Sequence, residues 1–193
     1  TALMRSFVQK CGGTFYMNFL AILNVLFYKY TGQTDIIIGS ASAGRPHLDL
    51  QPIIGMFVNT MAMRNYPGGR KTYETFLKEV INSSIRSLEN QDVQFEELVD
   101  HLGLDRDPSR SPLFDILMVV QNYLPVEQSK KTGQDAPARE PAATEPGQQP
   151  GSEIRDMDIG NTTSKFDITF FVYEEADNAN IILEYYTSIF IRQ

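Results

Sequence analysis

The residues best suited to chemistry in this chain are an amide and a hydroxyl, Asn59 and Thr60, within a mostly apolar stretch from Ile53 to Arg64. A buried amide without hydrogen-bond partners costs on the order of 1–3 kcal/mol. Asn59 is therefore expected either to be satisfied by other protein groups or to face a wet, functional cavity. Gly55 lies in the same stretch, and a glycine within a strand usually marks a bulge or a close backbone approach.

No familiar catalytic set or metal site is visible elsewhere in the sequence. The two histidines, His47 and His101, have no nucleophile beside them, and surface or helix-end positions are expected for both. Cys11 is the single cysteine, which excludes an internal disulfide and favours a reduced, cytoplasmic compartment. Because no Cys/His cluster has metal-ligand spacing, no metal site is predicted.

The composition narrows the possible classes of function. A length of 193 residues with 42% hydrophobic content fits one globular domain with a real core. The formal charge of −7 and the lack of a Lys/Arg stripe argue against a nucleic-acid partner. The longest apolar run, Phe15 to Tyr28, is too short to span a bilayer, so no membrane partner is expected. Because the chain has no starting Met and ends abruptly at Gln193, we expect it to be a piece of a longer protein.

Hydrophobic periodicity predicts an α/β arrangement around the Ile53 to Arg64 stretch. Thr14 is expected to cap a helix that ends at Gly32, and Thr72 to cap a second long helix. A short helix from Phe95 to Leu102 should end at Gly103. Strands are predicted at Asp35–Ser40, Val58–Asn65, Leu113–Gln121, Lys165–Glu174 and Asn180–Thr187, the last two forming an antiparallel hairpin.

Two further expectations concern burial and order. The first long helix has an apolar stripe that includes Leu26 and Tyr30, and it is predicted to be buried on most sides. Residues 125–151 contain five of the ten prolines and no aromatic residue. Such a segment has almost nothing to bury and is expected to be a mobile, disordered insert.

Three ordered motifs resemble signatures of condensation domains in nonribosomal peptide synthetases, and with two further segments they are spread over more than half the chain. They are Ile54-Gly-Met-Phe-Val-Asn-Thr60 with Arg64, Asn90-Gln-Asp-Val-Gln-Phe-Glu96, and Arg106-Asp-Pro-Ser-Arg-Ser-Pro-Leu113. The second motif departs from the family at Gln94, which replaces a usual proline. The segments Asp35 to Arg45 and Lys165-Phe-Asp167 also fit.

The resemblance implies an α/β fold, the chloramphenicol-acetyltransferase-like sandwich, present here as a single lobe with a mixed sheet and packed helices. The family's catalytic His-His-x-x-x-Asp-Gly signature belongs to the first of two lobes and is absent here. Residues 1–193 are thus expected to be the C-terminal lobe, with its final helix truncated and no activity alone. The implied reaction joins two aminoacyl groups carried on phosphopantetheine. The implied partners are the first lobe, upstream and downstream peptidyl carrier proteins, and an adjacent adenylation domain.

By resemblance, Asn59 lies at the floor of the tunnel between the lobes, where its amide could orient the acceptor amine or the thioester carbonyl. Gly55 and Thr60 share that tunnel segment. We expect structural roles for the other motif residues, including a helix cap at Asp92 and Glu96 at the same helix end. These residues are Arg45, Arg64, Gln91, Asp92, Glu96, Arg106, Asp107 and Arg110.

Two other functions remain open at this stage. One is an epimerisation relative, although the intact Phe57-Val-Asn-Thr60 speaks against it because such relatives usually differ there. The other is a degenerate lobe that serves only as a docking surface for carrier proteins. The sequence upstream of Thr1 would separate these from a condensation domain, since a His-His-x-x-x-Asp-Gly motif supports condensation and its loss supports docking.

Overall fold

The computed structural model describes residues 2–45, 47–104, 107, 110–121, 164–174 and 178–190. The helices are α1 (Ala2–Lys10), α2 (Phe15–Thr31), η1 (Leu48–Leu50, a 3₁₀ turn), α3 (Tyr73–Glu89) and α4 (Phe95–Leu102). The strands are β1 (Ile36–Ser42), β2 (Asn59–Asn65), β3 (Ile116–Gln121), β4 (Ile168–Glu174) and β5 (Ala179–Tyr185). The proline-rich 125–151 segment and residues 191–193 lie outside the described residues, so the expectations for them stay predictions.

Local sequence signals fix the helix ends. The Thr14 hydroxyl accepts a hydrogen bond from the Met17 N–H at 3.3 Å, and Gly32 ends α2 in the left-handed region at φ 72°. The Thr72 hydroxyl accepts from the Thr75 N–H at 3.2 Å and so caps α3. Gly103 ends α4 with φ 61°. These caps were predicted, and they are confirmed because each depends on residues within one helical turn.

The five strands form one mixed sheet in the order β2-β1-β3-β4-β5. β1 pairs with β2 antiparallel and with β3 parallel, while β4 pairs with β3 parallel and with β5 antiparallel. The predicted hairpin of the last two strands is confirmed, with Ile168 opposite Tyr185. β2 and β5 are therefore the two edges of the sheet.

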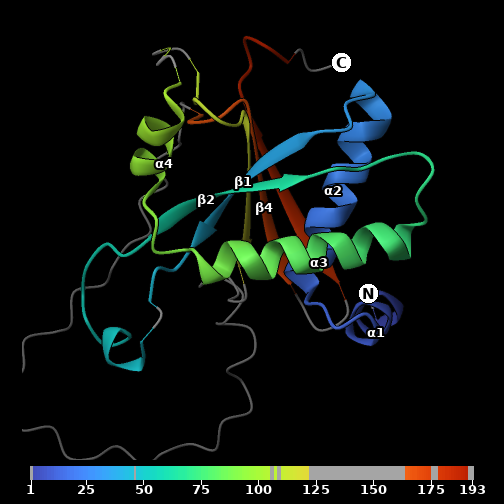
Figure 1. Cartoon of the computed structure of the whole chain (residues 1–193), viewed down its shortest axis with the longest axis horizontal. Coiled ribbons are helices and arrows are strands. Elements are labelled where there is room, and N and C mark those ends of the chain that lie inside the picture. The colour runs from blue at the N-terminus through green and yellow to red at the C-terminus, as the bar shows by residue number, and fades with distance from the viewer. Residues whose placement is uncertain are drawn as a thin grey trace, which may run out of the picture.

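The two faces of the sheet are covered differently. Helices α1, α2 and α3 supply the apolar cluster over one face, where Ile38, Met63 and Met118 are fully buried. Figure 1 shows α3 returning alongside β2, so that α4 lies near the start of that strand. Because side chains alternate along a strand, Gly39 and Leu117 lie on the opposite face. That face carries α4 and a separate pair of buried residues, Val99 and Phe114.

The prediction that α2 is buried on most sides is wrong for its C-terminal half. Tyr30 is 83% exposed and Leu26 is also exposed, and neither belongs to the hydrophobic core or packs against it. No single helix among the described residues is long and apolar enough to cross a membrane. Helices α1 and α2 satisfy such a test only together, and they are bent by 99° at the break between them.

Candidate functional site

Asn59 is buried at 5% exposure, and its amide is fully engaged by the protein. Its Nδ2 donates to the backbone oxygens of Gln91 at 2.7 Å and Val93 at 2.8 Å. Its Oδ1 accepts from the Thr60 N–H at 2.8 Å. Of the two states that the sequence allowed, the amide satisfied by protein groups is the one present in this lobe.

These hydrogen bonds hold the connection between α3 and α4 against the start of β2. The Ser42 hydroxyl, at the end of β1, donates to Oε1 of Gln91 at 2.7 Å. Ser42 and Asn59 are register partners across β1 and β2, so Gln91 contacts both strands. Because α3 packs on one face and Phe95 on the other, this connection passes around the sheet edge. The first two motifs therefore meet at one place in the fold.

The third motif and the Lys165–Asp167 segment join them at a cavity of about 360 Å³ on the same side as α4. It is lined by Thr60 from the first motif, Glu96 from the second and Arg110 from the third, and by Lys165 and Asp167 from the further segment. The remaining lining residues are Phe95, Ser111, Pro112, Phe114, Asp115 and Phe166. Segments more than 100 residues apart in sequence thus converge on one cavity.

Three phenylalanine rings form the apolar wall of this cavity. The Phe114 ring lies 5.5 Å from the Phe95 ring and 5.5 Å from the Phe166 ring, between centroids. A Cβ on Gly39 would lie 2.1 Å from Cε2 of Phe114, so only glycine lets this ring approach β1 so closely. The sequence analysis missed this cluster, although each phenylalanine adjoins or lies inside a recognised motif.

The polar wall includes one ion pair. Nη2 of Arg110 lies 2.7 Å from Oδ2 of Asp115, and this hydrogen bond raises the pKa of Arg110. Arg110 is therefore paired with Asp115, a partner that the sequence analysis did not identify. Glu96 lies in the first turn of α4, where a negative charge is favourable.

Arg45 holds the loop between η1 and β2. Its guanidinium donates to the backbone oxygens of Leu50, of Ile53 at 2.8 Å and of Gly55 at 3.2 Å. It also lies 4.2 Å from the centroid of the Phe57 ring. These contacts explain why an arginine with several donors suits the position.

The apolar residues of this loop are exposed. Ile53, Ile54, Met56 and Val58 are all exposed, and Ile54 is fully so. They precede the strand that was predicted to begin at Val58, because β2 begins at Asn59. We call residues 53–58 the apolar loop. Gly44 fixes its path, since a Cβ there would lie 1.6 Å from the Phe57 oxygen.

Arg64 lies away from the cavity, as an ion partner. It forms two hydrogen bonds with Asp35, Nε to Oδ1 at 2.9 Å and Nη2 to Oδ2 at 2.6 Å. These bonds lower the pKa of Asp35 and raise that of Arg64. Arg64 thus joins the start of β1 to the end of β2 through Asp35.

The remaining motif residues are Asp92, Arg106 and Asp107. The structure corrects the expectation for Asp92, and it describes Asp107 but not Arg106. Gln94 occupies the N-cap of α4 and makes no side-chain capping bond, so the expected cap at Asp92 is wrong. Asp92 is two residues too early for its carboxylate to be the cap. The Asp107 oxygen accepts from the Arg110 N–H at 3.2 Å, whereas Arg106 lies outside the described residues.

Neither histidine lines the cavity. His47 is exposed and its Nδ1 lies 3.3 Å from Asp49, while His101 is exposed in the last turn of α4. Within the described part of the chain, no group of three or more His, Cys, Asp or Glu residues is arranged to hold a metal ion. The cavity offers a hydroxyl, an aromatic wall and charged groups that include one ion pair, and such a set can position a substrate.

Comparison with known proteins identifies the family. The condensation domain family model matches residues 1–193. Bacitracin synthase 1 of Bacillus licheniformis is 39% identical over 190 residues, covering 98% of this chain and 3% of that protein. Tyrocidine synthase 3 of Brevibacillus parabrevis is 42% identical over 190 residues, covering 98% of this chain and 3% of that protein. The chain therefore belongs to the condensation domain family, and it spans only a small part of the length of these relatives.

Solved structures show the same fold. A four-domain nonribosomal peptide synthetase, holo-AB3403 bound to AMP and glycine, aligns with a TM-score of 0.73 at 23% identity, covering 95% of this chain and 14% of that one. The first condensation domain of the calcium-dependent antibiotic synthetase aligns with a TM-score of 0.67 at 12% identity. That alignment covers 97% of this chain and 36% of that one. The chloramphenicol-acetyltransferase-like α/β fold is confirmed.

Proposed function

We propose that residues 1–193 form the second, C-terminal lobe of a condensation domain that makes peptide bonds between carrier-tethered thioesters. In this reaction the amine of one aminoacyl group attacks the thioester carbonyl of another. Both substrates are held on phosphopantetheine arms of carrier proteins. A first lobe supplies the His-His-x-x-x-Asp-Gly motif, and an adenylation domain lies nearby in the same synthetase.

The observation that carries this proposal is the meeting of all the motif segments around Asn59 and the adjacent cavity. Thr60 and Glu96 reach the cavity from β2 and α4, and Asp167 reaches it from the segment before β4. A core needs no such gathering of charged and hydroxyl groups, because unpaired polar groups are costly to bury. The gathering suits a wall of a substrate tunnel.

The apolar loop supports a first lobe as partner. Soluble proteins rarely expose a contiguous apolar segment unless another surface covers it. Four apolar side chains within residues 53–58 are exposed, and Arg45 holds the loop in one conformation. A loop that is already ordered loses less conformational entropy when a partner covers it.

Within this proposal Asn59 acts on the substrate through its neighbours. Its amide hydrogens are used by Gln91 and Val93, so Asn59 sets the position of the turn that leads into α4. Thr60, the next residue, lines the cavity. Gly55 contributes its backbone oxygen to the Arg45 contacts that shape the loop.

The test is a chimera in which residues 1–193 replace the matching segment of tyrocidine synthase 3. The chimera and the isolated chain are each given two loaded carrier proteins, and dipeptidyl thioester is measured. We expect product from the chimera and none from the isolated chain. The unmodified tyrocidine synthase segment is the matched control.

Three outcomes would contradict the proposal in different ways. Product from the isolated chain would remove the need for a first lobe. A folded chimera that binds carriers without making product would favour the docking lobe. A folded chimera that inverts the donor residue without condensing it would favour an epimerisation domain.

A further inference from the structure

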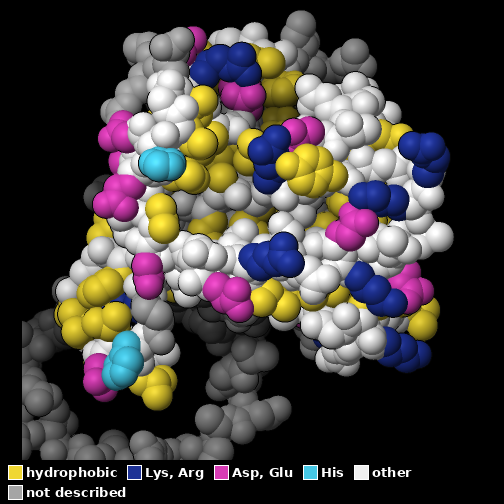
Figure 2. Space-filling view, in the orientation of Figure 1, with side chains coloured by type: hydrophobic (Ala, Val, Ile, Leu, Met, Phe, Trp, Pro, Cys, Tyr) yellow, Lys and Arg dark blue, Asp and Glu magenta, His cyan; other side chains and the backbone are white. Residues whose placement is uncertain are grey.

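The two edges of the sheet are protected to different degrees, and β2 is the protected one. The outward N–H of Thr60 bonds to the Asn59 side chain at 2.8 Å, and the Arg64 oxygen accepts from the Ser83 hydroxyl at 3.3 Å. Helix α3 packs along this strand, and Figure 2 shows acidic and basic side chains interspersed over it. A further strand would therefore meet backbone groups that the chain already uses.

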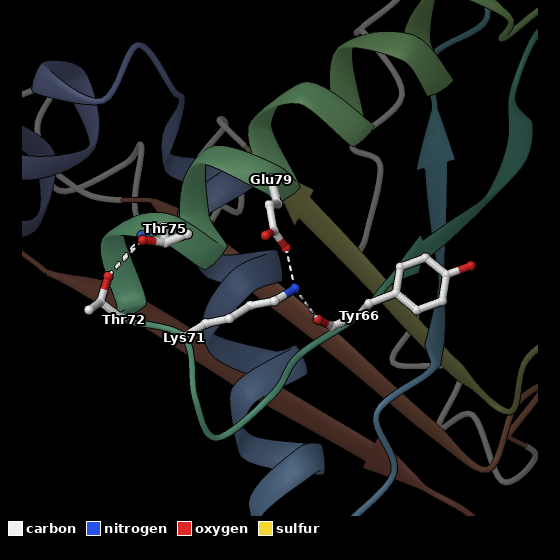
Figure 3. A network of polar contacts seen from close by, with 5 residues as sticks. All are labelled: Tyr66, Lys71, Thr72, Thr75 and Glu79. Carbon is white, nitrogen blue, oxygen red and sulfur yellow. Dashed lines mark hydrogen bonds and ion pairs between the residues drawn. The ribbon is translucent and has the colours of Figure 1, made fainter.

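A lysine extends this cover beyond the end of β2. Nζ of Lys71 donates to the Tyr66 oxygen at 3.0 Å and pairs with Glu79 of α3 at 2.6 Å (Figure 3). Side chains and helices that lie over an edge strand prevent it from pairing with another chain.

The β5 edge lacks these protections. β5 pairs with β4 residue for residue from Ala179 to Tyr185, so it has no bulge, and it contains no proline, lysine or arginine. Its central residues Ile181, Ile182 and Leu183 are 51%, 54% and 49% exposed. An exposed apolar edge strand without protective features is a site at which another strand can pair.

The outward backbone groups of β5 follow from a hydrogen bond at its end. The Tyr186 N–H donates to the Asp167 oxygen at 3.0 Å, so the backbone of Tyr186 faces β4. Backbone groups of an antiparallel strand alternate between its two sides, which directs those of Ile181, Leu183 and Tyr185 away from β4. Among the residues that the structure describes, the outward N–H and C=O of Ile181 and Leu183 have no hydrogen-bond partner.

We propose that the β5 edge binds a second copy of this chain, with the two β5 strands paired antiparallel about a two-fold axis at Ile182. Two identical strands related by such an axis run antiparallel and contribute the same residues to the contact. Ile181 of one copy then lies opposite Leu183 of the other. Both residues face outward, so each such pair can exchange two N–H···O bonds.

Side-chain chemistry selects this register over its neighbours. It places Ile182 opposite its own copy and Glu184 opposite Asn180, so that apolar residues meet apolar ones and a carboxylate meets an amide. A shift by two residues places Ile182 opposite either Glu184 or Asn180. A shift by one residue places outward-facing residues opposite residues that already bond β4, which removes the hydrogen bonds.

The assembly stops at two copies because the described sheet offers one unprotected edge. Pairing through β5 uses that edge, and each β2 edge that remains is covered by side chains and by α3. The proposal goes beyond the proposed condensation activity and does not depend on it, because β5 is the edge of the sheet opposite to β2 and Asn59.

The test measures the mass of residues 1–193 by analytical ultracentrifugation over a range of concentrations. We expect the 21.8 kDa monomer at ~1 µM and a growing share of dimer toward ~1 mM, the range of weak protein contacts. Ile182→Lys places two ammonium groups opposite each other and should weaken the dimer about tenfold. The matched control is Leu48→Lys, an exposed aliphatic residue in the connection between β1 and β2, which should leave the dimer unchanged.

Leu183→Pro tests the backbone exchange. Proline is tolerated on an edge strand where the N–H faces outward, so the variant should melt near the wild-type temperature. It should nevertheless weaken the dimer about tenfold, because each copy loses a hydrogen-bond donor.

Disulfide trapping tests the register in a Cys11→Ser background. Ile182→Cys places two thiols at a non-hydrogen-bonded pair, where Cα atoms about 4.5 Å apart are within reach of a disulfide. Leu183→Cys is the matched control, because its two thiols are offset by two residues, roughly 7 Å along the strands. We expect oxidised glutathione to crosslink the first variant and not the second.

Four results would overturn the proposal. They are a monomer mass at every concentration, a folded Ile182→Lys or Leu183→Pro variant that dimerises normally, and equal crosslinking of the two cysteine variants. The fourth is growth beyond the dimer, which would require a second unprotected edge.

Discussion

The two ends of one heptapeptide, Ile54 to Thr60, show the reverse of the usual relation between polarity and burial. The polar end is buried and the apolar end is exposed. At the polar end, Asn59 is 5% exposed and makes three hydrogen bonds with the protein. At the apolar end, Ile54 is fully exposed and Met56 nearly so. An ordinary strand would bury the isoleucine and leave the asparagine in water.

The difference shows that the two ends have different tasks. Asn59 is bound within the lobe, because its partners Gln91 and Val93 belong to the same fold. The apolar loop is held in place by Arg45 but left uncovered, so its hydrophobic surface is available to a second body. Substitutions at the two ends should therefore act on different properties, stability at one and association at the other.

The largest effect is expected from Asn59→Ala. The variant leaves two backbone oxygens and one N–H without their partner and should lower the free energy of unfolding by about 2–3 kcal/mol. Urea denaturation of residues 1–193 measures this loss. An unchanged midpoint would show that the amide contributes nothing to the lobe.

Asn59→Asp sharpens the same comparison through pH. An ionised carboxylate would face the oxygens of Gln91 and Val93, so its folded-state pKa should be raised. A raised pKa means that stability is present below the unfolded value of about 3.9 and is lost as pH rises through the folded one. We expect the deficit relative to wild type to be smaller at pH 4 than at pH 7. A deficit independent of pH would contradict the placement of this carboxylate.

Gly39→Ala should cost about 1–3 kcal/mol by overpacking the Phe114 ring. The new methyl would lie within 2.1–2.6 Å of three ring atoms. Gly68→Ala is the matched control, because nothing lies within 4 Å of a Cβ at that position. Thermal melts of the two variants should differ clearly, and equal melting temperatures would rule out the stacked arrangement.

Arg45→Lys should loosen the apolar loop without unfolding the lobe. Lysine cannot reproduce the several N–H donors or the ring contact, and losing about 1 kcal/mol locally corresponds to a roughly fivefold higher opening constant. Limited proteolysis within residues 50–57 should accelerate by that factor. Unchanged cleavage there would mean that the loop owes its conformation to something other than Arg45.

Tyr73→Phe tests the face of the sheet that α1, α2 and α3 cover. Its effect on stability should be about as large as that of Arg45→Lys, but it should depend on pH. The Tyr73 hydroxyl donates to Oδ1 of Asn18 at 2.9 Å, and burial raises the pKa of Tyr73 to about 12. The stability that it provides is complete below pH 10 and is lost as pH rises toward 12. The variant should be about 1 kcal/mol less stable at neutral pH and should lose less stability between pH 10 and 12. Parallel stability curves for the two proteins would contradict this.

The smallest effect on folding is expected at the other end of the heptapeptide. Ile54→Ser combined with Met56→Ser changes exposed side chains, so the free energy of unfolding should shift by no more than about 0.5 kcal/mol. Fluorescence of a hydrophobic dye on the folded protein should fall, because the exposed apolar area is reduced. A loss of stability comparable to that of Asn59→Ala would show that the loop is part of the core after all.

The sequence identified several residues of the candidate site, but it did not predict how they are arranged. The motif residues Thr60, Glu96 and Arg110 were identified, and they do line one cavity. The Phe95, Phe114 and Phe166 cluster was missed, because a phenylalanine beside a motif looks like any core residue until its neighbours are known. The pairing of Arg110 with Asp115 was missed as well, since a surface ion pair leaves no periodic signal.

The sequence alone determined those features that depend on residues within a turn of one another. Thr14 and Thr72 cap their helices and Gly32 and Gly103 end theirs, because a hydroxyl or a left-handed glycine acts on the nearest backbone groups. The exposure of Leu26 and Tyr30 was not visible in the apolar spacing of α2, since burial depends on which other elements pack against a helix.

Only the tertiary structure decided that, within the heptapeptide, the polar Asn59 is buried and the apolar Ile54 is exposed. The partners of Asn59 lie 32 and 34 residues away, and they come into reach because α3 runs back beside β2 before the chain passes around the sheet edge. The apolar loop is exposed because β2 starts after it and no described element packs over it. Hydrophobicity fixes how strongly a residue favours burial, but the path of the chain decides which residues have a surface to be buried against.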